Sequence, residues 1–288
     1  MELSLTISHS LRRLWKARRL DLLFTIIGLV IVIIISFMAI AASLVAPYDP
    51  LSSVDKALLP PSFKHIMGTD NLGRDVFSRL VYGSRTVMTV VLLSTFISMS
   101  IGTVAGLISG YFGGIVDRVL SLTMDSIYSF PGLILAIAIA SMLGPGVMNT
   151  VISISIVYIP TYFRMVRGQT LSIKNQLYVE AAEAMGASKL TILWKYVLPN
   201  VITVIPVVFS MNVADAVLTE AGLSFLGLGV PSPTPDWGFD LKNGQRNLLA
   251  GYWWISIFPG IMIVILALGF SLLGEGLNEL LNPERRYE

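Results

Sequence analysis

The sequence contains no cysteine and few charged residues. Without cysteine, the chain can form neither a disulfide framework nor a thiolate metal site. Lysine, arginine, aspartate and glutamate together make up 13% of the residues, against about 25% in a typical soluble domain. The net charge is only +2, which is too small to indicate a nucleic-acid-binding protein.

Motifs for catalysis and nucleotide binding are also missing. The two histidines, His9 and His65, lie in no H-E-x-x-H motif, and no G-x-S-x-G nucleophile elbow occurs. The phosphate-binding pattern G-x-x-x-x-G-K-[ST] is absent as well. We therefore expect a non-catalytic chain with no metal site and no cofactor of its own.

Apolar residues dominate instead. They make up 54% of the chain, and the mean hydropathy is +0.75. A soluble fold could not bury so many apolar side chains, so lipid must cover the rest. We predict an all-α membrane protein of about six transmembrane helices, with residues 1–21 as an N-terminal segment and 22–288 as one membrane domain. The expected spans are 22–46, 87–109, 119–143, 147–166, 201–222 and 252–274.

The first apolar run follows a basic stretch that includes Arg12, Arg13 and Lys16. A cleaved signal peptide is the competing interpretation, but its apolar core would be about 7–15 residues long, and this run is longer. With the N-terminus inside, thirteen of the twenty lysines and arginines fall on the cytoplasmic side. This bias predicts that both termini and the 168–200 loop are cytoplasmic.

The 168–200 loop is too polar to span a membrane. Good helix formers from 176 to 185 end at Gly186, and a second helical piece runs from 188 to 197. We call residues 176–197 the elbow. Its small residues would let another protein approach closely, and its glutamates could pair with basic groups. From the residues alone, a docking surface for a partner and an amphipathic helix lying on lipid are both open.

Two carboxylates, Asp215 and Glu220, fall in the fifth apolar run. A charged side chain at the bilayer centre costs roughly 2.5–3.5 kcal/mol on insertion scales. These side chains could line a translocation path, where they would meet a peptide amino terminus or another cation. They could equally cap a helix or bond to a partner subunit.

A polar turn on the outer side contains Asp70, Arg74 and Asp75. Local ion pairs that order the loop are the favoured interpretation. Binding of a carboxylate by Arg74 is the alternative.

Several segments together resemble the permeases of ABC importers. Glu180-Ala181-Ala182, Gly186 four residues later, and Leu198-Pro199 are similar to the EAA motif of that family, although Tyr196 stands where the motif has isoleucine. The segments 65–86, 143–150, 223–229 and 267–286 resemble the dipeptide, oligopeptide and nickel branch, and within it the C-type subunit.

The resemblance implies a type I permease fold in a prokaryotic inner membrane. It implies that the elbow and loop end couple to an ATPase, through Glu180, Ala181, Ala182, Glu183, Gly186, Leu198 and Pro199. It implies as partners a homologous second permease, two ATPase subunits that bind the ATP and magnesium, and an extracytoplasmic binding protein that meets the face around Asp70, Arg74 and Asp75. Peptides are the expected substrates, with oligosaccharides or nickel as alternatives. An ATP-independent secondary transporter or channel is the alternative of another class, but it would leave the EAA-like loop unexplained.

Overall fold

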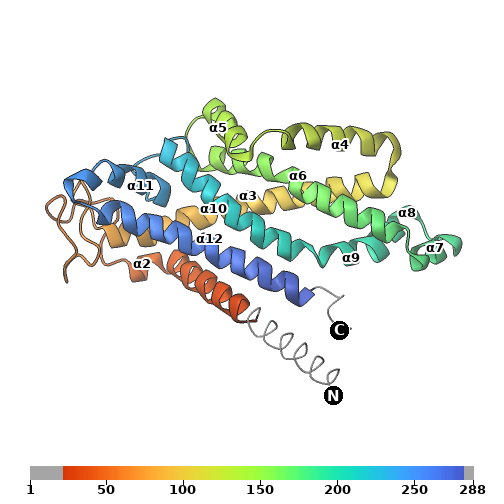
Figure 1. Ribbon diagram of the computed structural model, residues 1–288, viewed down its shortest axis with the longest axis horizontal. Coiled ribbons are helices and arrows are strands. Elements are labelled where there is room, and N and C mark those ends of the chain that lie inside the picture. The colour runs from red at the N-terminus through yellow and green to blue at the C-terminus, as the bar shows by residue number, and fades with distance from the viewer. Residues whose placement is uncertain (1–21, 282–288) are drawn as a thin grey trace, which may run out of the picture.

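The computed structural model describes residues 22–281, and every regular element in that range is a helix. The expected N-terminal segment 1–21 lies outside the described residues. The helices form an elongated bundle (Figure 1). They are the first helix at Leu22–Ile40, α2 (Ala42–Val45), α3 (Val76–Phe112), α4 (Gly114–Tyr128), α5 (Gly132–Leu143), α6 (Val147–Lys174), α7 (Leu177–Ala184), α8 (Lys189–Ile192), a π-helical turn (Leu193–Val197), α9 (Leu198–Ile202), α10 (Ile205–Leu226), α11 (Trp237–Gln245), a 3-10 turn (Leu248–Ala250) and α12 (Trp254–Leu281).

The two ends of the bundle differ in structure. The 46–75 loop and α11 lie at one end, which we call the outer end, and α7 and α8 of the elbow lie at the other (Figure 1). The all-helical prediction is confirmed. The core at the centre is formed by α3, α6, α10 and α12, whose buried residues include Val87, Ile154, Val217 and Leu266.

Within residues 22–281, three helices are long and apolar enough to cross a membrane: Leu22–Ile40, Val76–Phe112 and Trp254–Glu279. The number rises to five if two bent helix pairs each count as one span, namely α4 with α5, and 189–202 with α10. The expected 147–166 span lies within α6 but is not among them. This helix carries buried polar residues, among them Thr150, Ser153 and Ser155, and its contacts are with other helices of the chain.

The second span begins eleven residues earlier than expected. Asp75 caps α3 by accepting a hydrogen bond from the Ser78 amide, so the helix already starts at Val76. The expected start at residue 87 left Arg79 and Arg85 before the span. In the structure, Arg79 pairs with Asp240, and Arg85 donates to the carbonyls of Ala39 and Ile40. Arginines can lie in this helix because their charges and donors have partners.

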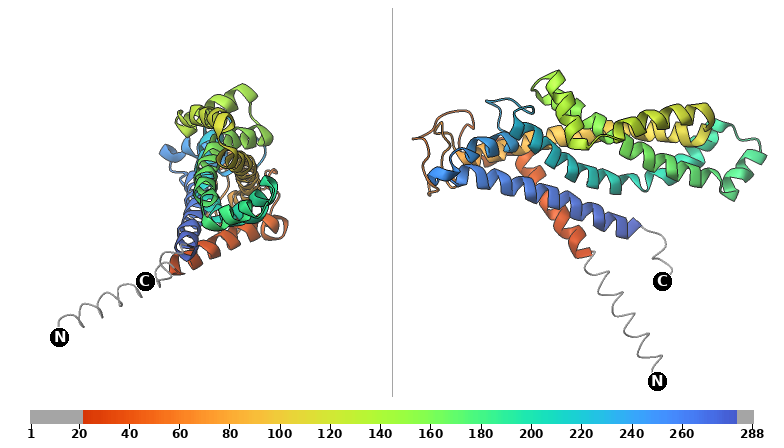
Figure 2. Two further views of the ribbon diagram at one scale, coloured as in Figure 1. Left: turned by 90° about the vertical axis from the view of Figure 1, so that its right-hand side faces the viewer. Right: turned by 45° about the horizontal axis from the view of Figure 1, so that its top comes forward.

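The third expected span, 119–143, is not one straight helix. It is divided into α4 and α5, which meet at an angle of 90°. Pro131 stands at the N-cap of α5, and proline has no N–H with which to continue the hydrogen bonds of α4. Both helices lie along the outside of the bundle (Figure 2). The proline therefore redirects the chain where a continuous span was expected.

Helices α3 and α6 pack closely through a row of glycines. Gly102, Gly106 and Gly110 recur every fourth residue on α3 and face α6. A Cβ atom added at Gly106 would lie 2.8 Å from the carbonyl oxygen of Phe163. Without side chains at these positions the two backbones can approach each other, as small residues allow in membrane helices. We call this contact the glycine seam.

The first helix joins the bundle by the same means. A Cβ atom on Gly28 would lie 2.6 Å from the carbonyl oxygen of Gly269 in α12. About two turns further along α12, Gly276 leaves room for Thr25. Apart from this contact, much of the helix is exposed, including Ile33, Phe37 and Ile40. Such a surface suits lipid.

We predict that Gly106→Ala destabilises the chain by about 1–3 kcal/mol, because the added methyl group must push the α6 backbone away. Gly168→Ala is the matched control, because nothing lies within 4 Å of a Cβ there and the residue is also helical. The control should be neutral or slightly stabilising, since alanine favours helix over glycine. Thermal unfolding in detergent measures both. Equal midpoints for the two variants would contradict the glycine seam.

Candidate functional site

The elbow turns back sharply after α7. Gly186 has a φ of +87°, a left-handed conformation that glycine adopts without strain. The amide of Gly186 donates to the carbonyl of Glu183 (2.9 Å), and the amide of Ala187 donates to the carbonyl of Ala182 (3.1 Å). These two bonds form a Schellman motif, which closes the helix and satisfies its last carbonyls. Ser188 then caps α8 through the amide of Thr191.

One side of α7 anchors the elbow to the bundle. Val179 is buried in a cluster with Ile192, Val197 and Val201, and Ala182 on the same helix is buried as well. The sequence analysis counts Ala182 among the coupling residues, and the structure buries its side chain against the bundle. The remaining predicted positions are more accessible. Glu180, Ala181, Glu183, Gly186 and Pro199 are exposed, and Leu198 is half-buried.

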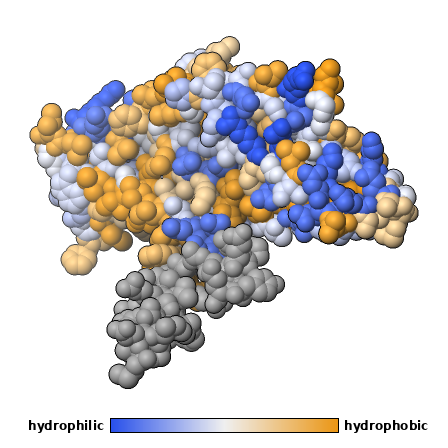
Figure 3. Space-filling model, turned by 45° about the vertical axis from the view of Figure 1, so that its right-hand side comes forward, coloured by the Kyte–Doolittle hydropathy of each residue, from blue (hydrophilic) through white to orange (hydrophobic). Residues whose placement is uncertain are grey.

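Large apolar side chains stand exposed beside these residues. Leu177 and Met185 keep about four fifths of their surface accessible, at 81% and 80%, and Leu190 and Trp194 are also exposed. Figure 3 shows hydrophilic side chains gathered toward the elbow end, with apolar ones between them. Sequence reasoning did not single out these apolar residues. The elbow thus presents a mixed surface of carboxylates and apolar groups.

Two ion pairs fasten α4 to α6 near the elbow. Asp117 accepts from Arg167, with a distance of 2.7 Å from Nη2 to Oδ2, and also from the Ser109 hydroxyl. About two helical turns nearer the bend, Asp125 accepts from Nη2 of Arg164 at 2.7 Å. The Arg164 guanidinium also lies 3.9 Å from the centre of the Tyr128 ring. The position of α4 therefore follows that of α6, which leads directly into the elbow.

The two carboxylates of α10 have different surroundings. Asp215 is exposed, on the same face as Met211 and Leu218. Its carboxylate has no hydrogen-bond or ion-pair partner within the described residues. Glu220 has 0% of its surface exposed and accepts a hydrogen bond from the hydroxyl of Ser224 (2.9 Å). Five residues along a helix place Glu220 on nearly the opposite side of α10 from Asp215, and the role of either residue in lining a path stays a prediction.

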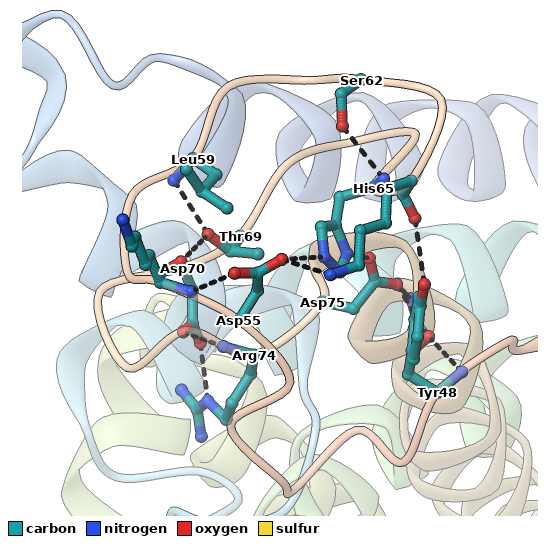
Figure 4. A network of polar contacts seen from close by, with 12 residues as sticks. Tyr48, Asp55, Leu59, Ser62, His65, Thr69, Asp70, Arg74 and Asp75 are labelled. Atoms are coloured by element: carbon teal, nitrogen blue, oxygen red, sulfur yellow. Dashed lines mark hydrogen bonds and ion pairs between the residues drawn. The ribbon is translucent and has the colours of Figure 1, made fainter.

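The predicted outer residues are brought together, as Figure 4 shows. Arg74 donates from Nε to Oδ2 of Asp70 at 2.6 Å, and the Asp70 carboxylate also accepts from the amides of Leu72 and Arg74. All three predicted side chains are buried: Asp70, Arg74 and Asp75. They order the loop, as the favoured interpretation held, and a partner at this face would meet the loop they shape.

His65 links Asp75 to the exposed part of the same loop. Its Nδ1 lies 2.8 Å from Oδ1 of Asp75, and its Nε2 lies 3.4 Å from Oδ2 of Asp55. Asp55 also accepts from Lys64 at 2.6 Å. That hydrogen bond, together with one from the Lys56 amide, lowers the pKa of Asp55 to about 2. The imidazole is buried between these groups and holds the 55–75 loop against the start of α3.

A buried ion pair joins α3 to α11. Arg79 donates from Nη2 to Oδ1 of Asp240 at 2.6 Å and from Nη1 to the carbonyl of Pro50 at 3.1 Å. Burial raises the pKa of Asp240, and the positive charge of Arg79 opposes that rise. Nearby, the Trp237 indole donates to the Leu80 carbonyl (2.9 Å) and lies over Gly83. Sequence reasoning missed this contact, because Arg79 and Asp240 are 161 residues apart.

Comparison with known proteins gives one family. Residues 102–287 match the family described as binding-protein-dependent transport system inner membrane component. The glutathione transport system permease protein GsiD of Pectobacterium atrosepticum is 39% identical over 259 residues, which is 89% of this chain and 85% of that protein. The proteins of the same name from Escherichia coli O6:K15:H31 and Shigella boydii are each 39% identical over 255 residues, covering 88% of this chain and 84% of theirs.

We predict that Arg79→Met destabilises the chain by about 3–5 kcal/mol, because it leaves Asp240 buried without its cation. The double variant Arg79→Met, Asp240→Leu should recover much of that loss, since both charges are then gone. Unfolding of the purified chain in detergent measures the two changes. A double variant that is as unstable as the single one would show that the ion pair is not the cause.

Proposed function

Because the chain belongs to the family of binding-protein-dependent transport system inner membrane components, the permeases of ABC importers, we propose that it forms half of a peptide path driven through its elbow. It is a multi-pass protein of the inner membrane. The elbow is the observation that carries the proposal. A compact helical turn stands out from the bundle with carboxylates and apolar side chains exposed together.

The proposed partner of the elbow is an ATPase subunit. Leu177, Met185 and Leu190 would enter a groove on that subunit, and Glu180 and Glu183 would pair with basic groups around it. Burying exposed apolar side chains at such a contact is favourable by about 25 cal/mol per Å². ATP and magnesium would bind on two such subunits. The sister permease would complete the path, and a binding protein would deliver the substrate at the outer end.

The elbow is well placed to transmit movement. It stands between α6 and α10, so a shift of the elbow displaces both helices. The glycine seam joins α6 to α3, and the Arg164 and Arg167 ion pairs join α6 to α4. ATP binding, which favours closed ATPases, would shift the path between two arrangements through these contacts. An ATP-independent transporter would have no use for this elbow.

Peptide is the proposed substrate class. The similar permeases are named for glutathione transport, and glutathione is a tripeptide. Asp215 supports the same class, because it is an exposed carboxylate with no partner among the described residues, on a helix of the expected span. A charged group there is costly in lipid and suits a water-filled path. It would attract the amino group of a short peptide between the apolar side chains of Met211 and Leu218.

The proposal is tested by reconstituting the chain with its sister permease, ATPases and binding protein in vesicles. We expect ATP-dependent uptake of glutathione or other short peptides in preference to oligosaccharides and nickel. Vesicles without ATP are the control. Uptake of another solute under ATP would refute the substrate but keep the mechanism, and uptake that needs no ATP would refute the mechanism.

For the elbow, we predict that Gly186→Val uncouples ATP hydrolysis from uptake while the chain still inserts into the membrane. A β-branched residue at positive φ costs about 1–3 kcal/mol and would distort the turn after α7. Gly186→Asn is the matched control, because asparagine tolerates the left-handed conformation. Uptake and ATP hydrolysis are measured in the same vesicles. Normal uptake by the valine variant would contradict the coupling role.

For the path, we predict that Asp215→Asn slows uptake of a peptide with a free amino terminus by roughly tenfold, the value of one charge-assisted hydrogen bond. Asp215→Glu should restore much of the rate, because it keeps the charge. Membrane insertion and ATP hydrolysis should stay unchanged in both variants. An unchanged uptake rate in Asp215→Asn would remove Asp215 from the path.

A further inference from the structure

Two fully buried carboxyl groups meet at the outer end of the bundle. Glu220 lies near the end of α10, and Asp236 is the N-cap residue of α11, across the 227–235 loop. Both side chains have 0% of their surface exposed. The start of α11 packs on this part of α10, because a Cβ atom on Gly238 would lie 2.8 Å from the Cβ of Ser224, whose hydroxyl binds Glu220. Two buried carboxyl groups at such a contact require an explanation, because like charges in a buried place repel strongly.

Each carboxyl group has one oxygen with a donor and one without. Oε1 of Glu220 accepts from the Ser224 hydroxyl at 2.9 Å, and Oδ1 of Asp236 accepts from the Phe239 amide at 2.9 Å. Oε2 of Glu220 and Oδ2 of Asp236 are buried and have no hydrogen-bond partner in the part of the chain that the structure describes. One proton between these two oxygens would satisfy both, whereas two ionised groups would satisfy neither.

The neighbouring arginines already have partners. Arg79, on α3, uses Nε and Nη2 for Asp240 and Nη1 for the carbonyls of Pro50 and Pro233. Arg74 binds Asp70. The ammonium group of Lys242, on α11, lies beside Gly227. Among residues 22–281, no ion pair joins a cation to Glu220 or Asp236; burial raises the pKa of Asp236, and the charge of Arg79 opposes that rise.

We propose that Glu220 and Asp236 bind one proton between them, and that this shared proton fastens the outer end of α10 to the start of α11. The Ser224 hydroxyl supports the same junction, because it also accepts from the amide of Val230 at 3.2 Å. Loss of the proton would leave two anions in contact and would loosen the 227–235 loop. The site belongs to the chain itself and holds whether or not the substrate proposed above is right.

Infrared spectroscopy of the purified full chain in lipid nanodiscs tests the shared proton directly. At neutral pH the wild type should show a protonated-carboxyl C=O band that is missing from Glu220→Gln and from Asp236→Asn. Either amide supplies a hydrogen at the shared position, and the Asp236→Asn variant keeps the oxygen that accepts from Phe239. If one variant fails to fold, the other carries the same test. Absence of the band from the wild type would overturn the proposal.

Thermal unfolding gives the second readout. At neutral pH, the unfolding midpoints of both amide variants should lie within a few degrees of that of the wild type. The midpoint of Glu220→Leu should be lower by more than about 5 °C, because Asp236 then remains buried with no donor for Oδ2. The wild type should lose stability as the pH rises above the ordinary carboxyl pKa of about 4, because the unfolded chain then releases the proton that the folded chain keeps, and the loss ends once the buried pair itself ionises. Glu220→Gln should lose less over the same pH range.

Two further results would refute the shared proton. If the unfolding midpoints of the wild type and of Glu220→Gln fell equally as the pH rose, another group would be the one that titrates. A midpoint that rises with added sodium or calcium in the wild type but not in Glu220→Gln, with no carboxyl band, would show that a metal cation occupies the site instead.

Discussion

The close contact between α3 and α6 is the constraint on which the rest of the structure depends. In lipid, apolar side chains gain nothing by leaving one apolar environment for another, so helices associate through close packing and hydrogen bonds. Gly102, Gly106 and Gly110 permit that packing along the second half of α3. Helix α3 begins at the outer end and α6 leads into the elbow. The glycine seam thereby sets the position of each end of the molecule relative to the other.

Charge at the outer end follows a rule of pairing. Arg74 with Asp70, Arg79 with Asp240, and His65 with Asp75 are all buried. A buried charge without a partner is strongly destabilising, and each of these groups has one. Glu220 and Asp236 form no ion pair with a cation among the described residues, and the proposed shared proton would remove one of their two negative charges. The outer end thus holds most of its buried charged groups in pairs.

The elbow end is built differently, because its charged groups remain at the surface. Val179 and Ala182 hold α7 to the bundle, while Glu180, Glu183 and Met185 remain exposed. The Asp117 and Asp125 ion pairs are also partly accessible. Pairs of this kind can be broken at modest cost, which suits a region expected to move.

The membrane class, the helical architecture, the family and the location of the elbow were all readable from the sequence, because hydropathy, glycine placement and the Glu-Ala-Ala spacing are local properties of the chain. The bend at Pro131, the early start of α3 and the inward side of Ala182 were not. Each depends on what a residue meets from elsewhere in the fold. Arg79 reads as a loop residue until Asp240, 161 residues away, neutralises it. Asp215 and Glu220 look equivalent in sequence, and only the packing around α10 exposes one and buries the other. Charge and burial are properties of neighbours in space, and for that reason the tertiary structure alone decided them.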